Sequence, residues 1–293
     1  MKRQVLLVYL LVTANFALAD TIHGINMDFV TIGNPGNAAD TQVMNDGTTG
    51  YGAVSYNYRI GKYEVTNAQW NAFVSTAGAP RGNPYYAYDS NAYWTGAQQP
   101  SSYVSWYEAA QFCNYLTSGD KSKGVYQFSG NNINPVDFLG INRTAAQTTY
   151  GTIYVVPTED EWYKAAYYKP NASGYSLYAN GQDTIPAADN GWNYCGGAYD
   201  IPWDVGTGTQ EQNGTFDMMG NFWEWNETLI GSNRSLRGGM LGLTDVTLAS
   251  SNRFNRVPES EFGMIGFRVA SIVPEPASLL LLGLGGLALR RRQ

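Results

Sequence analysis

The chain contains very little histidine and cysteine, and these shortages remove most catalytic chemistries. Its 293 residues include one histidine, His23, and two cysteines, Cys113 and Cys195. With a single histidine near the N-terminus, we exclude a Ser-His-Asp triad, an H-E-x-x-H zinc site and a histidine-bound iron. The two cysteines form one disulfide or remain buried thiols, and the sequence leaves both interpretations open.

Charge is also scarce, and basic charge most of all. Charged residues make up 14% of the chain. Without Lys2, Arg3, Glu275 and the arginines at 290–292, 13 basic and 23 acidic residues remain, a net charge of about −10. An acidic surface argues against nucleic acid and anionic lipid as partners. It is compatible with divalent cations.

Aromatic residues and glycine are abundant instead. Aromatics reach 14%, with 22 tyrosines and 33 glycines, and Asn, Gly, Ser and Thr cluster throughout. Helical bundles do not have this composition. It predicts a single loop-rich α+β domain in which aromatic side chains fill the gaps between irregular segments. No linker or long repeat divides the central 250 or so residues, a length that fits one large domain.

The N-terminus has the features of a secretory signal peptide. Lys2 and Arg3 precede a largely apolar stretch over residues 5–18, and Ala17-Leu18-Ala19 is an A-x-A site. We therefore predict cleavage after Ala19 and leave residues 1–19 out of the fold.

The C-terminus has the features of an envelope-sorting tail. Pro274-Glu275-Pro276 is followed by 13 apolar residues, 277–289, and by three arginines, 290–292. As a helix the run covers roughly 20 Å, against a bilayer core of about 30 Å, and the arginines favour the cytoplasmic side. The tail resembles the PEP-CTERM signal of Gram-negative bacteria. That resemblance implies transient inner-membrane anchoring, processing by an exosortase, and a final place in the envelope, surface or extracellular matrix. A C-terminal amphiphilic or buried helix is the alternative.

Three helices are predicted from capping boxes, in which a Ser or Thr oxygen accepts a backbone N–H three residues later. The boxes are Thr66 to Gln69, Ser105 to Glu108 and Thr158 to Glu161. Each follows a short strand-like run, at residues 63–65, 103–104 and 153–156. Strand, cap and helix thus recur as an architectural theme.

Six motifs occur in an order that identifies a family. They are Tyr58-Arg59-Ile60-Gly61-Lys62-Tyr63-Glu64-Val65-Thr66-Asn67, Val104-Ser105-Trp106-Tyr107-Glu108-Ala109, Pro157-Thr158-Glu159-Asp160-Glu161-Trp162, Gly220-Asn221-Phe222-Trp223-Glu224-Trp225, Leu236-Arg237-Gly238-Gly239 and Gly266-Phe267-Arg268. Together they resemble the formylglycine-generating enzyme, or sulfatase-modifying factor, family. The resemblance implies a single α+β domain of the C-type-lectin-like kind.

The resemblance divides the chain into four parts. Residues 1–19 are the signal peptide, 20–54 an N-terminal segment leading into the domain, 55–271 the family domain and 272–293 the sorting tail.

The family's oxidase chemistry is not supported by the residues present. Its enzymes bind copper(I) with two cysteines after an Arg-Gly-Gly-Ser motif, because soft thiolates favour that ion. Those positions fall at Leu243 and Leu248, and no cysteine follows Cys195. We therefore expect no copper. The related sulfoxide synthases need iron held by histidines, which a single histidine cannot supply.

A calcium site is implied by the resemblance. Its ligands would be the side chains of Asp217 and Glu224 and the backbone carbonyls of Gly220 and Phe222, hard oxygens of the kind calcium prefers. The alternative is that Glu224 pairs with an arginine, Arg237 or Arg268, and that the neighbouring tryptophans belong to the core.

A ligand-binding loop is predicted over residues 240–261, where the family's groove would lie. Its polar side chains Asn252, Arg253, Asn255 and Arg256 could bind a polymer or a peptide, or could belong to a solvated loop.

The leading hypothesis is an exported, non-catalytic binding module whose partners are exopolysaccharide or surface proteins. An oxidase or another enzyme on the same fold is the alternative, and a purely structural matrix component is a third hypothesis.

Overall fold

The structure is a computed structural model that describes residues 19–80, 93–129, 137–188, 190–194 and 201–273. A five-stranded sheet joins the two ends of this part of the chain. Its strands run in the order β1 (Ala19–Ile22), β2 (Ile25–Ile32), β3 (Tyr58–Gly61), β11 (Ala270–Ile272) and β6 (Ile153–Val155). Every neighbouring pair is antiparallel.

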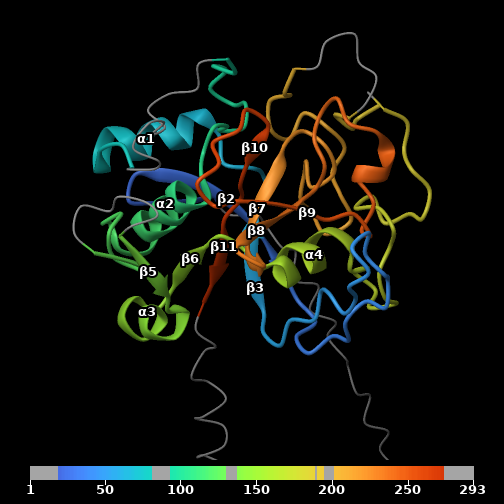
Figure 1. Cartoon of the computed structure of the whole chain (residues 1–293), viewed down its shortest axis with the longest axis horizontal. Helices are drawn as coiled ribbons and strands as arrows, with labels where there is room; N and C mark the ends of the chain where they lie inside the picture. Colours follow the sequence, from blue (N-terminus) through green and yellow to red (C-terminus); the bar gives the residue numbers. More distant parts are fainter. Residues whose placement is uncertain (1–18, 81–92, 130–136, 189, 195–200, 274–293) are drawn as a thin grey trace, which may run out of the picture.

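A second sheet lies beside the first and positions the candidate site (Figure 1). Its order is β10 (Ile265–Gly266), β7 (Trp223–Ile230), β8 (Asn233–Arg237) and β9 (Phe254–Arg256). β10 runs parallel to β7, and the other pairs are antiparallel. A small ribbon of β4 (Tyr126–Phe128) and β5 (Phe138–Ile141) completes the strands of the described residues.

The three predicted helices are confirmed, with their capping boxes intact. They are α1 (Asn67–Ala77), α2 (Trp106–Ser118) and α4 (Glu159–Tyr167), and each begins directly after its capping Thr or Ser. A fourth helix, α3 (Arg143–Tyr150), lacks a capping box and buries only Ala146, which explains why the sequence did not reveal it. A 3₁₀ turn, η1 (Asp245–Thr247), precedes the last strands.

Two of the three predicted strands before the helices are wrong. Of the predicted run 153–156, residues 153–155 form a strand, β6, but residues 63–65 and 103–104 form none. Residues 63–65 instead connect β3 to α1, and an isolated bridge joins the next residue, Thr66, to Pro100. Tyr103 has a positive φ of 59°, which is incompatible with an extended strand.

The core is built largely from aromatic side chains, as the composition predicts. Trp70 of α1 stacks on Phe112 of α2 at 5.9 Å, and both meet Phe267 edge to face. Every residue of α2 from Trp106 to Thr117 is buried. Such ring pairs add about 0.5–1.5 kcal/mol each beyond the area they bury.

The segment 20–54 contributes to the same core and sheet as the residues that follow it. Alternate residues of β2 face inward, so that Ile25, Met27 and Phe29 are buried, and Met44 and Val54 are buried as well. β2 pairs with β3 over four residues. The folded unit therefore includes β1 and β2.

The predicted signal peptide, apart from Ala19, and the sorting residues Pro274, Glu275 and Pro276 lie outside the described residues. Among those described, no helix has the length and hydrophobicity needed to cross a bilayer. Cys113 is buried in α2, whereas Cys195 lies outside the described residues, so their pairing stays untested.

Candidate functional site

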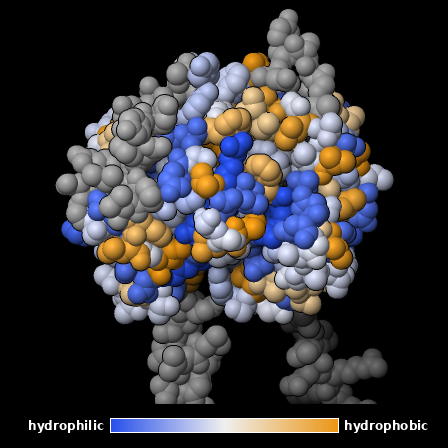
Figure 2. All heavy atoms as spheres, in the orientation of Figure 1, coloured by the Kyte–Doolittle hydropathy of each residue, from blue (hydrophilic) through white to orange (hydrophobic). Residues whose placement is uncertain are grey.

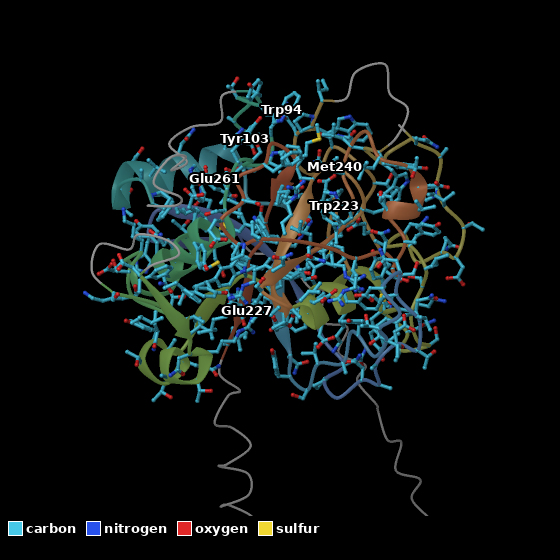
Figure 3. All side chains as sticks on the ribbon, in the orientation of Figure 1. Trp94, Tyr103, Trp223, Glu227, Met240 and Glu261 are labelled. Atoms are coloured by element: carbon cyan, nitrogen blue, oxygen red, sulfur yellow. The ribbon has the colours of Figure 1, made fainter. Side chains whose placement is uncertain are left out.

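A groove of about 350 Å³ opens where β7, β9 and the residues after β8 meet. We call it the Trp223 groove. Trp223 and Met240 both line it, and Figure 3 shows them close together near the start of β7. Apolar side chains make up most of its wall: Trp223, Met240, Leu243, Phe254, Phe262 and Ile265.

One cation at the rim of the groove is held by aromatic rings alone. The Arg256 guanidinium lies 4.5 Å from the ring centre of Phe262 and 5.8 Å from that of Phe254. Both phenylalanines are exposed, and Phe254 also packs on Trp223 at 5.8 Å. Within the described part of the chain, no carboxylate pairs with this guanidinium. Arg256 is therefore available to an acidic group of a ligand.

Arg253, predicted as a ligand residue, lines the groove, but its guanidinium is also bound within the domain. Its guanidinium donates to both carboxylate oxygens of Glu159, at 2.9 and 2.5 Å, and to Asp46 at 2.8 Å. Arg237 binds the same Glu159, at 2.8 Å through Nε, and donates to the backbone carbonyls of Ser250 and Asn252. This buried network attaches the groove's loop to α4.

The remaining predicted ligand residues differ in availability. Asn252 lines the groove, and its side chain makes no hydrogen bond within the described residues. Asn255 accepts a 2.6 Å hydrogen bond from the Asn233 amide on the neighbouring strand. Of the four, Arg256 and Asn252 line the groove with side chains that make no hydrogen bond or ion pair within the described residues.

The two positions assigned to the copper ligands differ in burial. Leu243 lines the groove, half-buried, whereas Leu248 is completely buried and its carbonyl accepts from the Tyr167 hydroxyl. Neither can donate a thiolate. The one described cysteine, Cys113, is inside α2, and burial raises its pKa well above the ordinary value of 9.0, which disfavours a thiolate.

Both carboxylates of the implied calcium site have protein partners in this arrangement. Arg268 donates to both carboxylate oxygens of Glu224, at 2.5 and 2.6 Å, and Trp162 donates to one of them at 2.7 Å. Glu224 and Arg268 are both fully buried. Asp217 accepts from the Gly206 N–H at 2.8 Å. Among the described residues, no group of three or more His, Cys, Asp or Glu side chains is placed to hold a metal.

Arg268 has further carboxylates around it, and two of them, Glu64 and Glu211, were not predicted as site residues. Glu64 accepts from the Asn221 side chain and the Phe222 N–H, and thereby fixes the Gly220–Trp225 motif from β3's side. Burial raises the pKa of Glu64 well above its ordinary value and that of Glu211 to about 8, with Arg268 opposing both shifts. Burial likewise raises the pKa of Asp217 to about 6. Glu64 lies inside a recognised motif, which was the available signal.

Two family models match the chain from residue 33 to residue 293. Residues 33–273 match the family described as sulfatase-modifying factor enzyme 1-like domain, and residues 273–293 match the PEP-CTERM protein-sorting motif. Both agree with the resemblances carried by the motifs. The sorting motif implies recognition by an exosortase and supports export to the cell envelope.

One curated protein and several solved structures are similar to this chain. A curated relative, the chaperone protein LppX of Paenibacillus barcinonensis, is 25% identical over 185 residues, which is 57% of this chain and only 61% of that protein. Treponema denticola variable protein 1 has a TM-score of 0.64 and 21% identity, covering 86% of this chain and 98% of its own.

Two further structures are similar. PvdO from Pseudomonas aeruginosa has a TM-score of 0.59 and 17% identity over 85% of this chain and 95% of its own. CarF has a TM-score of 0.60 and 20% identity over 83% of this chain and 97% of its own. At these identities the similarity shows the fold alone, and it confirms the expected α+β, C-type-lectin-like architecture.

Proposed function

Because the chain belongs to the sulfatase-modifying factor enzyme 1-like domain family and carries an envelope-sorting motif, we propose that it is an exported, non-catalytic binding module. The Trp223 groove is its binding site. One observation carries the proposal: a leucine, Leu243, lines the groove at a position where the resemblance places a copper-binding cysteine. The groove thus keeps a hollow for a ligand and lacks the thiolates for oxidation.

The chemistry of the groove favours a segment of a surface protein. Its wall accepts an apolar side chain, and Arg256 at the rim accepts a carboxylate nearby. The domain's excess of acidic residues makes this unpaired cation stand out in its surroundings. We therefore propose a peptide ligand with an apolar residue close to an acidic one, and exopolysaccharide is the alternative partner.

Substitution of Arg256 tests the groove. An array of short peptides, with and without an acidic residue beside an apolar one, is incubated with the full-length protein in parallel with a glycan array. We expect binding to acidic, apolar peptides that Arg256→Ala weakens roughly tenfold or more, because a hydrogen bond to a charged group contributes about 1.5–3 kcal/mol.

Arg59→Ala is the matched control, since Arg59 pairs with Asp20 at the five-stranded sheet and does not line the groove. It should bind like the wild type. Binding that Arg256→Ala leaves unchanged, or binding to glycans alone, would contradict the peptide assignment.

Metal analysis separates the binding module from the enzyme alternative. We expect purified protein to hold no stoichiometric copper and to consume no oxygen with a sulfatase-derived cysteine peptide. About one copper per chain together with peptide-dependent oxygen consumption would overturn the non-catalytic proposal.

We also propose that residues 277–289 anchor the precursor transiently in the inner membrane before exosortase acts, with the arginines 290–292 on the cytoplasmic side. Fractionation of cells with and without exosortase tests this. Equal release of the protein from both strains would contradict it.

A further inference from the structure

A second cavity, of about 440 Å³, lies between the turn after β1, the start of α1 and two loops that contain Gln98 and Val205. We call it the Tyr63 cavity. α1 and β2, which border it, contact each other and lie side by side in Figure 1. It shares no lining residue with the Trp223 groove. We propose that the Tyr63 cavity binds one neutral saccharide unit.

Part of the polar lining is used to build the cavity itself. Gln69 accepts from the Thr66 N–H at 2.9 Å and donates to the Asn26 carbonyl at 2.7 Å, so it ties the start of α1 to β2. Thr66 in turn accepts from the Gln69 N–H. These bonds set the positions of the walls before any ligand arrives.

Other polar groups in the lining remain uncommitted. The Asp28 carboxylate, the Gln98 amide and the Tyr63 hydroxyl make no hydrogen bond or ion pair with any residue in the described ranges. The Asn26 amide oxygen accepts from Thr21, whereas its NH₂ group has no partner in the same ranges. A carboxylate, two amides and a phenol supply both donors and acceptors around one hollow, which matches the mixed donor and acceptor character of sugar hydroxyls.

The Tyr63 ring is held in place from outside the cavity. A Cβ on Gly206 would lie 2.5 Å from the ring carbon Cε1, so this glycine, at φ +77°, lets the backbone approach the ring. Phe216 packs on the same ring at 5.4 Å, and the Lys62 ammonium lies 5.3 Å from its centre. A fixed aromatic ring suits the apolar C–H face of a sugar.

The charge of the lining argues for a neutral ligand. Among the described residues, Asp28 is the only Asp, Glu, Lys, Arg or His side chain that lines the cavity. An acidic sugar would face this carboxylate with no cation among the described lining residues, and the net charge of the domain is also negative. The two hollows thus differ in chemistry: a mostly apolar groove with a cation at its rim, and a polar cavity with a carboxylate. This inference does not depend on the function proposed for the groove.

Saturation-transfer NMR with the full-length protein tests the proposal. The probes are the methyl glycosides of glucose, galactose, mannose and N-acetylglucosamine, with glucuronate and glucosamine as charged arms. We expect saturation of the ring protons of at least one neutral glycoside, no transfer to glucuronate, and at least tenfold weaker binding in Asp28→Ala and, independently, in Gln98→Ala.

Asp245→Ala removes the same charge from an exposed position outside the cavity, and Arg256→Ala removes the groove's cation. Both should bind the glycoside like the wild type, and thermal unfolding shows that each variant is folded. Any one of three results would overturn the proposal. They are no saturation transfer to any neutral glycoside, transfer to glucosamine alone, or glycoside binding that survives in folded Asp28→Ala and Gln98→Ala. Loss of groove binding in the peptide array with glycoside binding intact would leave it standing.

Discussion

Individual buried ion pairs connect segments of this protein that lie far apart in the sequence. Glu224 and Arg268 are completely buried, as are Glu159 and Arg237. Removing one partner of such a pair typically costs about 3–5 kcal/mol, because the other charge stays buried without compensation. With only 14% charged residues in the chain, a notable share is therefore structural. Arg253, which lies in the predicted binding loop and lines the groove, is bound to Glu159 in the same way.

Glu211 makes stability depend on pH. Burial raises its pKa in the folded state from 4.5 to about 8, with Arg268 opposing the shift. The folded state thus binds this proton more tightly than the unfolded state, and the stabilisation is complete below about pH 4.5 and lost as pH rises through about 8. Asp217, with a pKa raised by burial to about 6, acts in the same direction. We expect the Tm to fall between pH 5 and pH 8, and to fall less in Glu211→Gln, as measured by calorimetry. If the Tm of the wild type and that of Glu211→Gln fell equally between pH 5 and pH 8, Glu211 would not be the cause of the pH dependence.

Helix starts are the elements whose positions follow most directly from local chemistry. In each capping box the side chains of residues three apart satisfy backbone N–H groups that the helix leaves unpaired, so no distant residue is needed. Strands behaved differently: residues 63–65 and 103–104 have strand-like composition but no partner strand along them. A strand depends on neighbours in space, which composition does not reveal.

Two threonines provide a matched test of capping. Thr158 accepts from the Glu161 N–H before α4, whereas Thr244 precedes η1 and its side chain makes no capping bond. We expect Thr158→Ala to lower the free energy of unfolding by about 1 kcal/mol and Thr244→Ala to change it little. Urea unfolding of both variants measures the difference, and equal losses would show that α4 does not depend on its cap.

At the scale of the whole molecule, the fold is closed by residues from opposite ends of the chain. β11 lies between β3 and β6, and β2 extends the same sheet on the other side of β3. Residues 19–32 are therefore part of the domain, although the matched family begins at residue 33. The Trp223 groove and the Tyr63 cavity lie on a frame that needs both ends.

Truncation tests this closure. A chain beginning at residue 33 loses four buried side chains of β2, Ile25, Met27, Phe29 and Ile32. At about 1.5–3 kcal/mol each, their burial is comparable to a total stability of about 5–15 kcal/mol. We expect this chain to show no cooperative thermal unfolding by circular dichroism. Removal of residues 274–293, which belong to the matched sorting motif, is the control, and we expect it to leave the Tm unchanged. If the chain that begins at residue 33 unfolded cooperatively at the Tm of the full-length chain, the role of β2 would be contradicted.

The sequence by itself determined the sorting motif, the family, the fold class and three helix starts, because each depends on residues that are close together or in a fixed order. From the sequence, Arg237 and Arg268 were both open as partners of Glu224. Only the tertiary structure assigned Arg268, 44 residues away, and turned Arg253 toward Glu159, 94 residues away. Such pairs depend on how sheets and loops are placed relative to one another, and the two hollows exist only where separate segments leave space between them.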